Sequence, residues 1–264
     1  MSDRRRAKGL HFPGEVHDRA LAGWGIRRRR GDLAVDSVPT GSAEIAADSS
    51  ATEALKESPI VHAAVENVAS PTIETVSAGP ADLGKLAQQV SGCEQCPLSH
   101  TRTQTVFGVG DPQARLMFVG EAPGAEEDRR GEPFVGRAGQ LLDRIITQGL
   151  KLTRDQVYIA NVLKCRPPEN RDPRPEEVAA CRNYLEQQIE AVKPEIIVAL
   201  GKPAAAFLTG QETSLKRLRG QSHLYKDVPV VVTYHPAFLL RQPQYKSECW
   251  RDLQSVISAL DLPR

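Results

Sequence analysis

The sequence has few aromatic residues and almost no net charge. Phenylalanine, tryptophan and tyrosine make up 5% of its 264 residues, and 34 lysines and arginines nearly balance 33 aspartates and glutamates. A chain of this balance is not a polycation, so any contact with nucleic acid has to use a local basic face rather than bulk charge. The length suffices for one domain with a substantial core and an appendage.

Long apolar runs are missing as well. No stretch approaches the length of about 20 residues that spans a membrane, and the N-terminus lacks the basic-then-apolar order of a secretory signal. We therefore expect a soluble, cytoplasmic protein. The chain has only five cysteines, which without a secretory signal fit metal ligands or free thiols better than a disulfide framework.

Charge and composition divide the chain at about residue 80. Residues 1–30 hold nine lysines and arginines against three acidic residues, residues 31–80 hold one against eight, and residues 81–264 hold 24 against 22. Residues 31–80 have almost no large aromatic side chains and no lasting period, which is typical of a disordered tether. We predict a basic arm and acidic tether over 1–80 and a folded domain over 81–264. For the arm, a DNA contact and a solvated charge run both stay open.

The folded part alternates short apolar strands with helix-length segments. This alternation predicts a parallel sheet covered on both faces, and hence a three-layer α/β/α domain with a central four-stranded parallel sheet. The expected strands are 115–119, 157–162, 195–200 and 228–233, and the expected helices are 82–90, 138–149, 175–192, 203–208 and 246–260.

Polar residues follow the predicted strands at their carboxyl ends. The first strand leads to Glu121, the second to Asn161, the third to Lys202 and the fourth to His235. Parallel strands deliver these ends to one edge of the sheet, where open α/β sheets bind their ligands. An acid, an amide and an imidazole converging in a crevice predict an active site.

The connection after the first strand is the most informative segment. Residues 120–139 contain several carboxylates and glycines around a single aromatic side chain, Phe134. Glycines let backbone approach a flat or anionic ligand closely, and the carboxylates are too many for a passive turn. We interpret this connection as part of the ligand site.

Four cysteines form two pairs along the chain. Cys93 and Cys96 lie in a polar loop with two residues between them, and fifteen residues separate Cys165 from Cys181. Four thiolates suit either tetrahedral zinc or an iron–sulfur cluster. The wide second pair favours a 4Fe-4S cluster mildly, and zinc stays open. The fifth, Cys249, is interpreted as core packing.

Together these motifs resemble those of the family 4 uracil-DNA glycosylases, the bacterial and archaeal iron–sulfur type. The resemblance covers roughly residues 83–260. It rests on ordered matches, namely Gly-Glu-Ala-Pro-Gly at 120–124, the segment 131–139, Asn-Val-Leu-Lys-Cys-Arg-Pro-Pro at 161–168, the four cysteines, and His-Pro-Ala-Phe-Leu-Leu-Arg at 235–241. It implies a DNA repair enzyme of base excision repair. Such an enzyme hydrolyses the N-glycosidic bond of deoxyuridine, releases uracil and leaves an abasic site.

The resemblance implies roles for three of the residues already singled out. Phe134 resembles the residue that stacks on the extruded uracil ring. Asn161 resembles the amide that reads the base edge, accepting from uracil N3–H and donating to O4, a pattern that cytosine reverses. His235 resembles the histidine that donates to uracil O2 as negative charge grows there.

The water-activating group does not follow from the resemblance alone. In family 1 enzymes an aspartate that orients water stands at the position of Ala122, and family 4 enzymes share its absence. Glu121 and Glu127 are the candidates by position, and the sequence does not divide roles between them. The backbone at Glu121, Ala122, Pro123 and Gly124 is expected to line the base pocket.

The resemblance also implies a cofactor and a partner. Cys93, Cys96, Cys165 and Cys181 are implied as ligands of a 4Fe-4S cluster. The expected partner is uracil-containing DNA, single- or double-stranded, bound by a monomer, with DNA contacts from Arg241, Lys202 and Lys246. Two interpretations of residues 236–241 stay open, a wedge inserted into the gap left by the flipped nucleotide and the start of a buried helix.

Three other functions remain alternatives. A related class traps uracil-DNA covalently through a histidine in a basic inserted loop, but residues 166–172 contain none. A non-catalytic iron–sulfur module that binds nucleic acid in a repair or replication complex would not need the three pocket residues, and neither would an iron–sulfur electron carrier.

Overall fold

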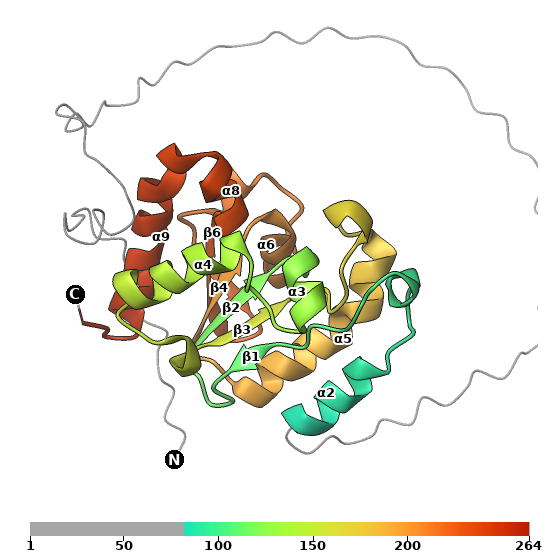
Figure 1. Ribbon diagram of the computed structural model, residues 1–264. Coiled ribbons are helices and arrows are strands. Elements are labelled where there is room, and N and C mark those ends of the chain that lie inside the picture. The colour runs from blue at the N-terminus through green and yellow to red at the C-terminus, as the bar shows by residue number, and fades with distance from the viewer. Residues whose placement is uncertain (1–81, 264) are drawn as a thin grey trace, which may run out of the picture. The chain divides into compact units, whose positions relative to one another are not determined.

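The computed structural model describes residues 82–263, so the predictions for the arm and tether over 1–80 lie outside the described residues. Within this range, six strands form one sheet in the order β1-β3-β2-β4-β6-β5 (Figure 1). Their bounds are β1 Val109–Gly110, β2 Leu116–Gly120, β3 Tyr158–Asn161, β4 Ile196–Leu200, β5 His223–Tyr225 and β6 Val228–Thr233.

The four central strands run parallel, as the apolar runs predict, and the sheet is larger than predicted. β3, β2, β4 and β6 pair in parallel, whereas β1 pairs with β3 and β5 pairs with β6 in antiparallel fashion. The two edge strands have two and three residues. Elements this short show no hydrophobic period, which is why the predicted sheet stops at four strands.

Helices cover both faces of the sheet. Their bounds are α2 Leu83–Ser91, α3 Ala125–Arg130, α4 Arg137–Arg144, α5 Pro175–Val192, α6 Lys202–Thr209, α7 Leu215–Leu218, α8 Pro236–Arg241 and α9 Lys246–Ala259. Short 3-10 turns occupy η1 Pro97–His100, η3 Arg154–Gln156, η4 Pro168–Asn170 and η5 Pro243–Tyr245, and a π-helical turn occupies η2 Ile145–Gly149. The helix expected over 138–149 is therefore α4 followed by this π-helical turn.

Side chains of alternate strand residues pack into two separate cores, one on each face of the sheet. This confirms the predicted three-layer α/β/α domain. In β2, Leu116 and Phe118 pack with α4, α8 and α9, while Met117 and Val119 pack with α5, α6 and α7. This alternation is the two-residue period of a strand buried on both faces. No helix among the described residues is long and apolar enough to cross a membrane.

The register places the carboxyl ends of the central strands level with one another. Gly120 of β2 pairs with Asn161 of β3, and Leu200 of β4 pairs with Thr233 of β6. The residues that follow these strands therefore emerge along one edge of the sheet, as the sequence predicts.

Candidate active site

A cavity of about 410 Å³ lies at this edge. The loops after β2, β3 and β6 provide its walls, and helix α8 provides one side. Of the residues predicted for the site, those that line the cavity are Glu121, Ala122, Pro123, Glu127, Phe134, Asn161, His235 and Arg241. Lys202 is exposed and Lys246 half-buried, and neither lines the cavity.

Phe134 lies at the bottom of this cavity in a strained backbone conformation. Its φ is 54°, in the left-handed region that a bulky residue rarely adopts, and its side chain is 5% exposed. Glycines on both sides make room for it. A Cβ on Gly139 would lie 1.8 Å from the Phe134 carbonyl oxygen, and a Cβ on Gly120 would lie 2.5 Å from the ring. A strained backbone of this kind persists only where the surrounding residues hold it in place, as the close packing on both sides of Phe134 does. Such strain occurs most often at functional sites.

Asn161, the last residue of β3, presents a buried acceptor that has no partner. The residue is 2% exposed, and its Oδ1 makes no hydrogen bond within the described residues. Its own carbonyl oxygen accepts a 2.6 Å hydrogen bond from Nζ of the buried Lys164, which fixes the backbone behind it. Because a buried polar atom without a partner costs free energy, Asn161 is suited to a ligand that brings a donor.

His235 precedes α8 and caps it. The Ala237 amide donates to His235 Nδ1 at 3.2 Å, so the neutral ring carries its proton on Nε2. Burial, and then Arg241, lower the pKa of His235 to about 4, against a weaker effect of Glu127 in the opposite direction. The ring is therefore a neutral donor at physiological pH, and its centroid lies 5.6 Å from that of Phe134.

The two candidate glutamates differ sharply in their surroundings. Both oxygens of Glu127 accept backbone hydrogen bonds, from the Gly124 amide at 3.1 Å and from the Val135 and Gly136 amides at 3.0 and 2.9 Å. The Gly124 amide is thus engaged by Glu127 instead of being left for a base. Glu121 is half-buried, and burial and Asp172 raise the pKa of its carboxyl above the ordinary value.

The loop after β3 forms a wall of the cavity that the sequence prediction omits. Asn170, Arg171 and Asp172 line the cavity beside Pro167. Arg171 is anchored through bonds of 2.9 and 2.5 Å to both oxygens of the buried Glu177, which also accepts from the Arg174 amide. The sequence signal for this wall is the Pro-Pro pair at 167–168, a few residues after β3 ends at the ligand-binding edge.

Residues 236–241 form helix α8, which decides between the two interpretations given above. Leu239 is fully buried in the core and Leu240 packs against it. Neither leucine is free to act as a wedge. Phe238 and Arg241, on the other hand, line the cavity.

The two cysteine pairs come together on the far side of the β3 loop. Cys165 and Cys181 are buried in a small core, and Cys93 and Cys96 pack against it. The Arg102 guanidinium donates to Cys165 Sγ at 3.1 Å. Among residues 82–263, no three histidine, cysteine, aspartate or glutamate side chains are grouped so that they could hold one metal ion. Cys249 lies in the core with α9, as predicted.

Comparison with known proteins agrees with this geometry. A family model described as the uracil DNA glycosylase superfamily matches residues 107–254. The type-4 uracil-DNA glycosylase of Archaeoglobus fulgidus is 44% identical over 182 residues, which are 66% of this chain and 91% of the relative. The type-4 enzyme of Sulfurisphaera tokodaii is 43% identical over 182 residues, 66% of this chain and 83% of the relative. That of Thermotoga maritima is 46% identical over 158 residues, 59% of this chain and 82% of the relative.

Proposed function

Because the chain belongs to the uracil-DNA glycosylase superfamily, in its type-4 group, we propose that it hydrolyses the N-glycosidic bond of deoxyuridine in DNA. The reaction releases free uracil and leaves an abasic site, which is the first step of base excision repair. The base has to leave the helix to reach a cavity of about 410 Å³ at the sheet edge.

The unpartnered Asn161 Oδ1 is the observation that carries this proposal. It lies in the wall of a cavity that also holds an aromatic ring and a histidine donor. Uracil offers N3–H to this acceptor and O4 to the amide group of the same side chain. Cytosine has an acceptor at N3 and a donor at C4, so it would leave buried polar groups unpaired, and sites of this kind discriminate strongly.

Departure of the base is assisted by His235. Negative charge develops on uracil O2 as the glycosidic bond breaks. A neutral imidazole whose Nε2–H faces that oxygen stabilises the transition state more than the ground state. Phe134, whose ring lies beside the histidine with centroids 5.6 Å apart, stacks on the planar base.

The division between the two glutamates follows from their different surroundings. Glu127 uses both carboxylate oxygens to hold three backbone amides, so it positions the loop that carries Phe134. Glu121 has a carboxyl whose pKa is raised, which makes it the better base for the attacking water. Glu121 is therefore the residue that serves the water.

Four cysteines supply the donor set for a 4Fe-4S cluster. Cys93, Cys96, Cys165 and Cys181 share one small core, and thiolates are the ligands such clusters use. A bound cluster would cross-link the segment after α2, the loop after β3 and helix α5. Hydrolysis of the glycosidic bond needs no electron transfer, so a cluster bound there would serve a structural role.

DNA contacts surround the cavity mouth. Arg241 lines the cavity at the end of α8 and is exposed, which suits a phosphate flanking the flipped nucleotide. Lys202, exposed at the start of α6, and Lys246, at the start of α9, bind phosphates further along the strand. These contacts position the DNA and carry no base specificity.

Release of free uracil from defined oligonucleotides tests the function. Single-stranded and duplex oligonucleotides with one deoxyuridine, and matched ones with cytosine, are incubated with the wild type, Asn161→Ala and the exposed control Gln221→Ala. We expect multiple turnovers of uracil release by the wild type and the control, none from cytosine, and a large loss in Asn161→Ala. Binding without release, or a heat-stable protein–DNA adduct in place of free uracil, would contradict the proposal and favour the binding module or the covalent trap.

A further inference from the structure

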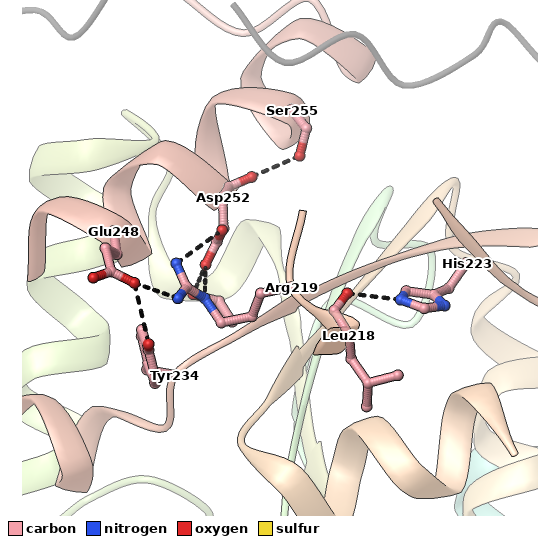
Figure 2. Close-up of polar contacts among 8 residues, drawn as sticks. Leu218, Arg219, His223, Tyr234, Glu248, Asp252 and Ser255 are labelled. Carbon is pink, nitrogen blue, oxygen red and sulfur yellow. Dashed lines mark hydrogen bonds and ion pairs between the residues drawn. The ribbon is translucent and has the colours of Figure 1, made fainter. Parts of the chain in front are cut away.

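A cluster of charged groups contacts the end of β6, just before His235 in the chain (Figure 2). Its centre is Arg219, which follows α7 and whose side chain is 9% exposed. The Arg219 guanidinium donates to both Asp252 oxygens at 2.8 and 3.2 Å and to Glu248 at 2.5 Å, the two acids lying one turn apart on α9. Leu218, just before the arginine, is held through its carbonyl by the His223 ring of β5 at 2.7 Å.

The same two carboxylates hold the two residues that precede His235. The Thr233 hydroxyl donates to Asp252 Oδ2 at 2.7 Å, and the Tyr234 hydroxyl donates to Glu248 at 3.1 Å. The Arg219 guanidinium lies over the Tyr234 ring, 4.0 Å from its centroid. The end of β6 is thereby fixed to α9 from two sides immediately before the histidine emerges into the cavity.

A second connection runs from this cluster to the cavity wall. The Tyr234 ring stacks on Phe238 of α8 with centroids 5.0 Å apart and contacts Tyr245 at 5.1 Å. Phe238 lines the cavity, whereas Arg219, Thr233, Tyr234, Glu248 and Asp252 do not. The cluster thus borders both the histidine and the helix that follows it without touching a bound base.

We propose that Arg219, Asp252 and Thr233 are positioning residues that set the orientation of the His235 ring through the end of β6. The proposal rests on the function proposed above. A buried ion pair contributes little net stability, because desolvation of both charges offsets their attraction. The ion pair instead restricts geometry. Arg219 and Thr233 together fix both carboxylate oxygens of Asp252, and this holds the end of β6 in place relative to α9.

Two substitutions at Thr233 separate packing from hydrogen bonding. Thr233 is completely buried, and Thr233→Val keeps its shape while it removes the hydroxyl that reaches Asp252. Thr233→Ser keeps the hydroxyl and removes a methyl group. Ser255→Ala is the matched control, since Ser255 is a buried residue on α9 whose hydroxyl donates to the Asp252 backbone carbonyl at 2.6 Å rather than to the Asp252 carboxylate.

The measurements are the single-turnover rate of uracil release at saturating enzyme, the DNA dissociation constant, and the imidazole NMR signals of His235, assigned with His235→Gln. We expect Thr233→Val to lower the rate by about tenfold or more with unchanged DNA affinity, and to shift the His235 signals. Thr233→Ser and Ser255→Ala should keep the wild-type rate and signals even where they lower the melting temperature.

Two results would separate failure of this inference from failure of the function. If Thr233→Val retains the wild-type rate and His235 signals, the cluster only stabilises the fold and the inference is wrong. If the wild type releases no uracil, the proposed function fails. In that case the NMR signals alone decide whether the cluster orients the ring, since they do not depend on turnover.

Discussion

His235 is held in one tautomer by the backbone that follows it. Because its Nδ1 accepts the Ala237 amide, protonation of the ring would break this bond as well as add charge to a buried site that faces Arg241. The ring is therefore a fixed neutral donor. A neutral donor suits a leaving uracil, whose negative charge builds up late and close to the ring.

The pH dependence of uracil release should reflect this neutral histidine. Since burial lowers the pKa of His235 to about 4 from an ordinary value of 6.5, we expect no inflection of the single-turnover rate near pH 6.5. The unfolded chain binds a proton at this residue before the folded chain does. The residue therefore subtracts progressively more from the free energy of unfolding as the pH falls from 6.5 toward 4. The measurements are the single-turnover rate and the urea midpoint from about pH 4 to about pH 8.

His235→Ala and His235→Gln are the controls for this profile. Alanine removes the donor and should lower the rate by about 100- to 1,000-fold. Glutamine offers a neutral N–H that does not titrate, so it should recover part of the rate. An inflection near pH 6.5 in the wild type that disappears in His235→Gln would show that the ring titrates normally and that the neutral-donor argument is wrong.

For single residues, the sequence predicts which kinds of side chain gather at the cavity better than it predicts what each side chain does there. Phe134, Asn161 and His235 are predictable because each stands at or just after a recognisable strand or motif. The role of Glu127 is not predictable, because it depends on the loop returning so that the amides of Val135 and Gly136 meet its carboxylate. No local pattern encodes a contact across eight or nine residues of irregular chain.

At the scale of elements, the end of β2 and the start of α4 together shape the cavity around Phe134. Gly120 is the last residue of β2, and a Cβ there would lie 2.4 Å from Asn161 Oδ1 and 2.5 Å from the Phe134 ring. Helix α4 approaches from the other side so closely that Gly139 leaves no room for a Cβ against the Phe134 backbone. The two elements thus hold Phe134 from two sides, β2 against its ring and α4 against its backbone.

A methyl group at Gly120 should therefore damage catalysis more than folding. Gly120→Ala pushes on two side chains of the pocket, and displacements of about 1 Å at such sites cost about 100-fold in rate. We expect a loss of this order in single-turnover uracil release. Gly92→Ala is the matched control, because a Cβ at that helix end meets nothing within 4 Å. Equal rates in the two variants would show that the pocket adapts and that the glycine is not required there.

The sequence predicts those helices and strands in which the spacing of apolar residues repeats over enough positions to be recognised. Helix α5 begins and ends as predicted, because Pro175 starts it and its apolar spacing continues to Val192. The turn η4 contributes to the cavity wall through Asn170 and was not predictable, since Glu169 and Asn170 adopt positive φ values of 56° and 55° without a glycine to indicate it. The anchoring of Arg171 on Glu177 of α5 helps to fix this segment as a wall of the cavity.

At the scale of the whole described domain, the cysteines join parts that the sheet does not. Helix α2 precedes the strands and lies beside α5, with Leu86 and Val90 in the same small core as Cys165 and Cys181 (Figure 1). This core is small compared with the two that cover the sheet. A structural cluster would therefore add cross-links that attach α2 and the loop after β3 more firmly to the domain.

Loss of one ligand should release the cluster and loosen this corner of the domain. We expect the wild type, purified without oxygen, to contain about four iron atoms per chain and to absorb in the visible range. Cys96→Ala should lose both, and it should lower the melting temperature and speed amide hydrogen exchange in α2 and residues 162–166 while the central strands stay protected. Cys249→Ala is the matched control, since it removes a buried thiol from the core that contains α9. This variant should keep the wild-type iron content. Iron retained by Cys96→Ala, or stoichiometric zinc in the wild type, would contradict the proposed cluster, because a 4Fe-4S centre bound by these residues needs all four thiolates.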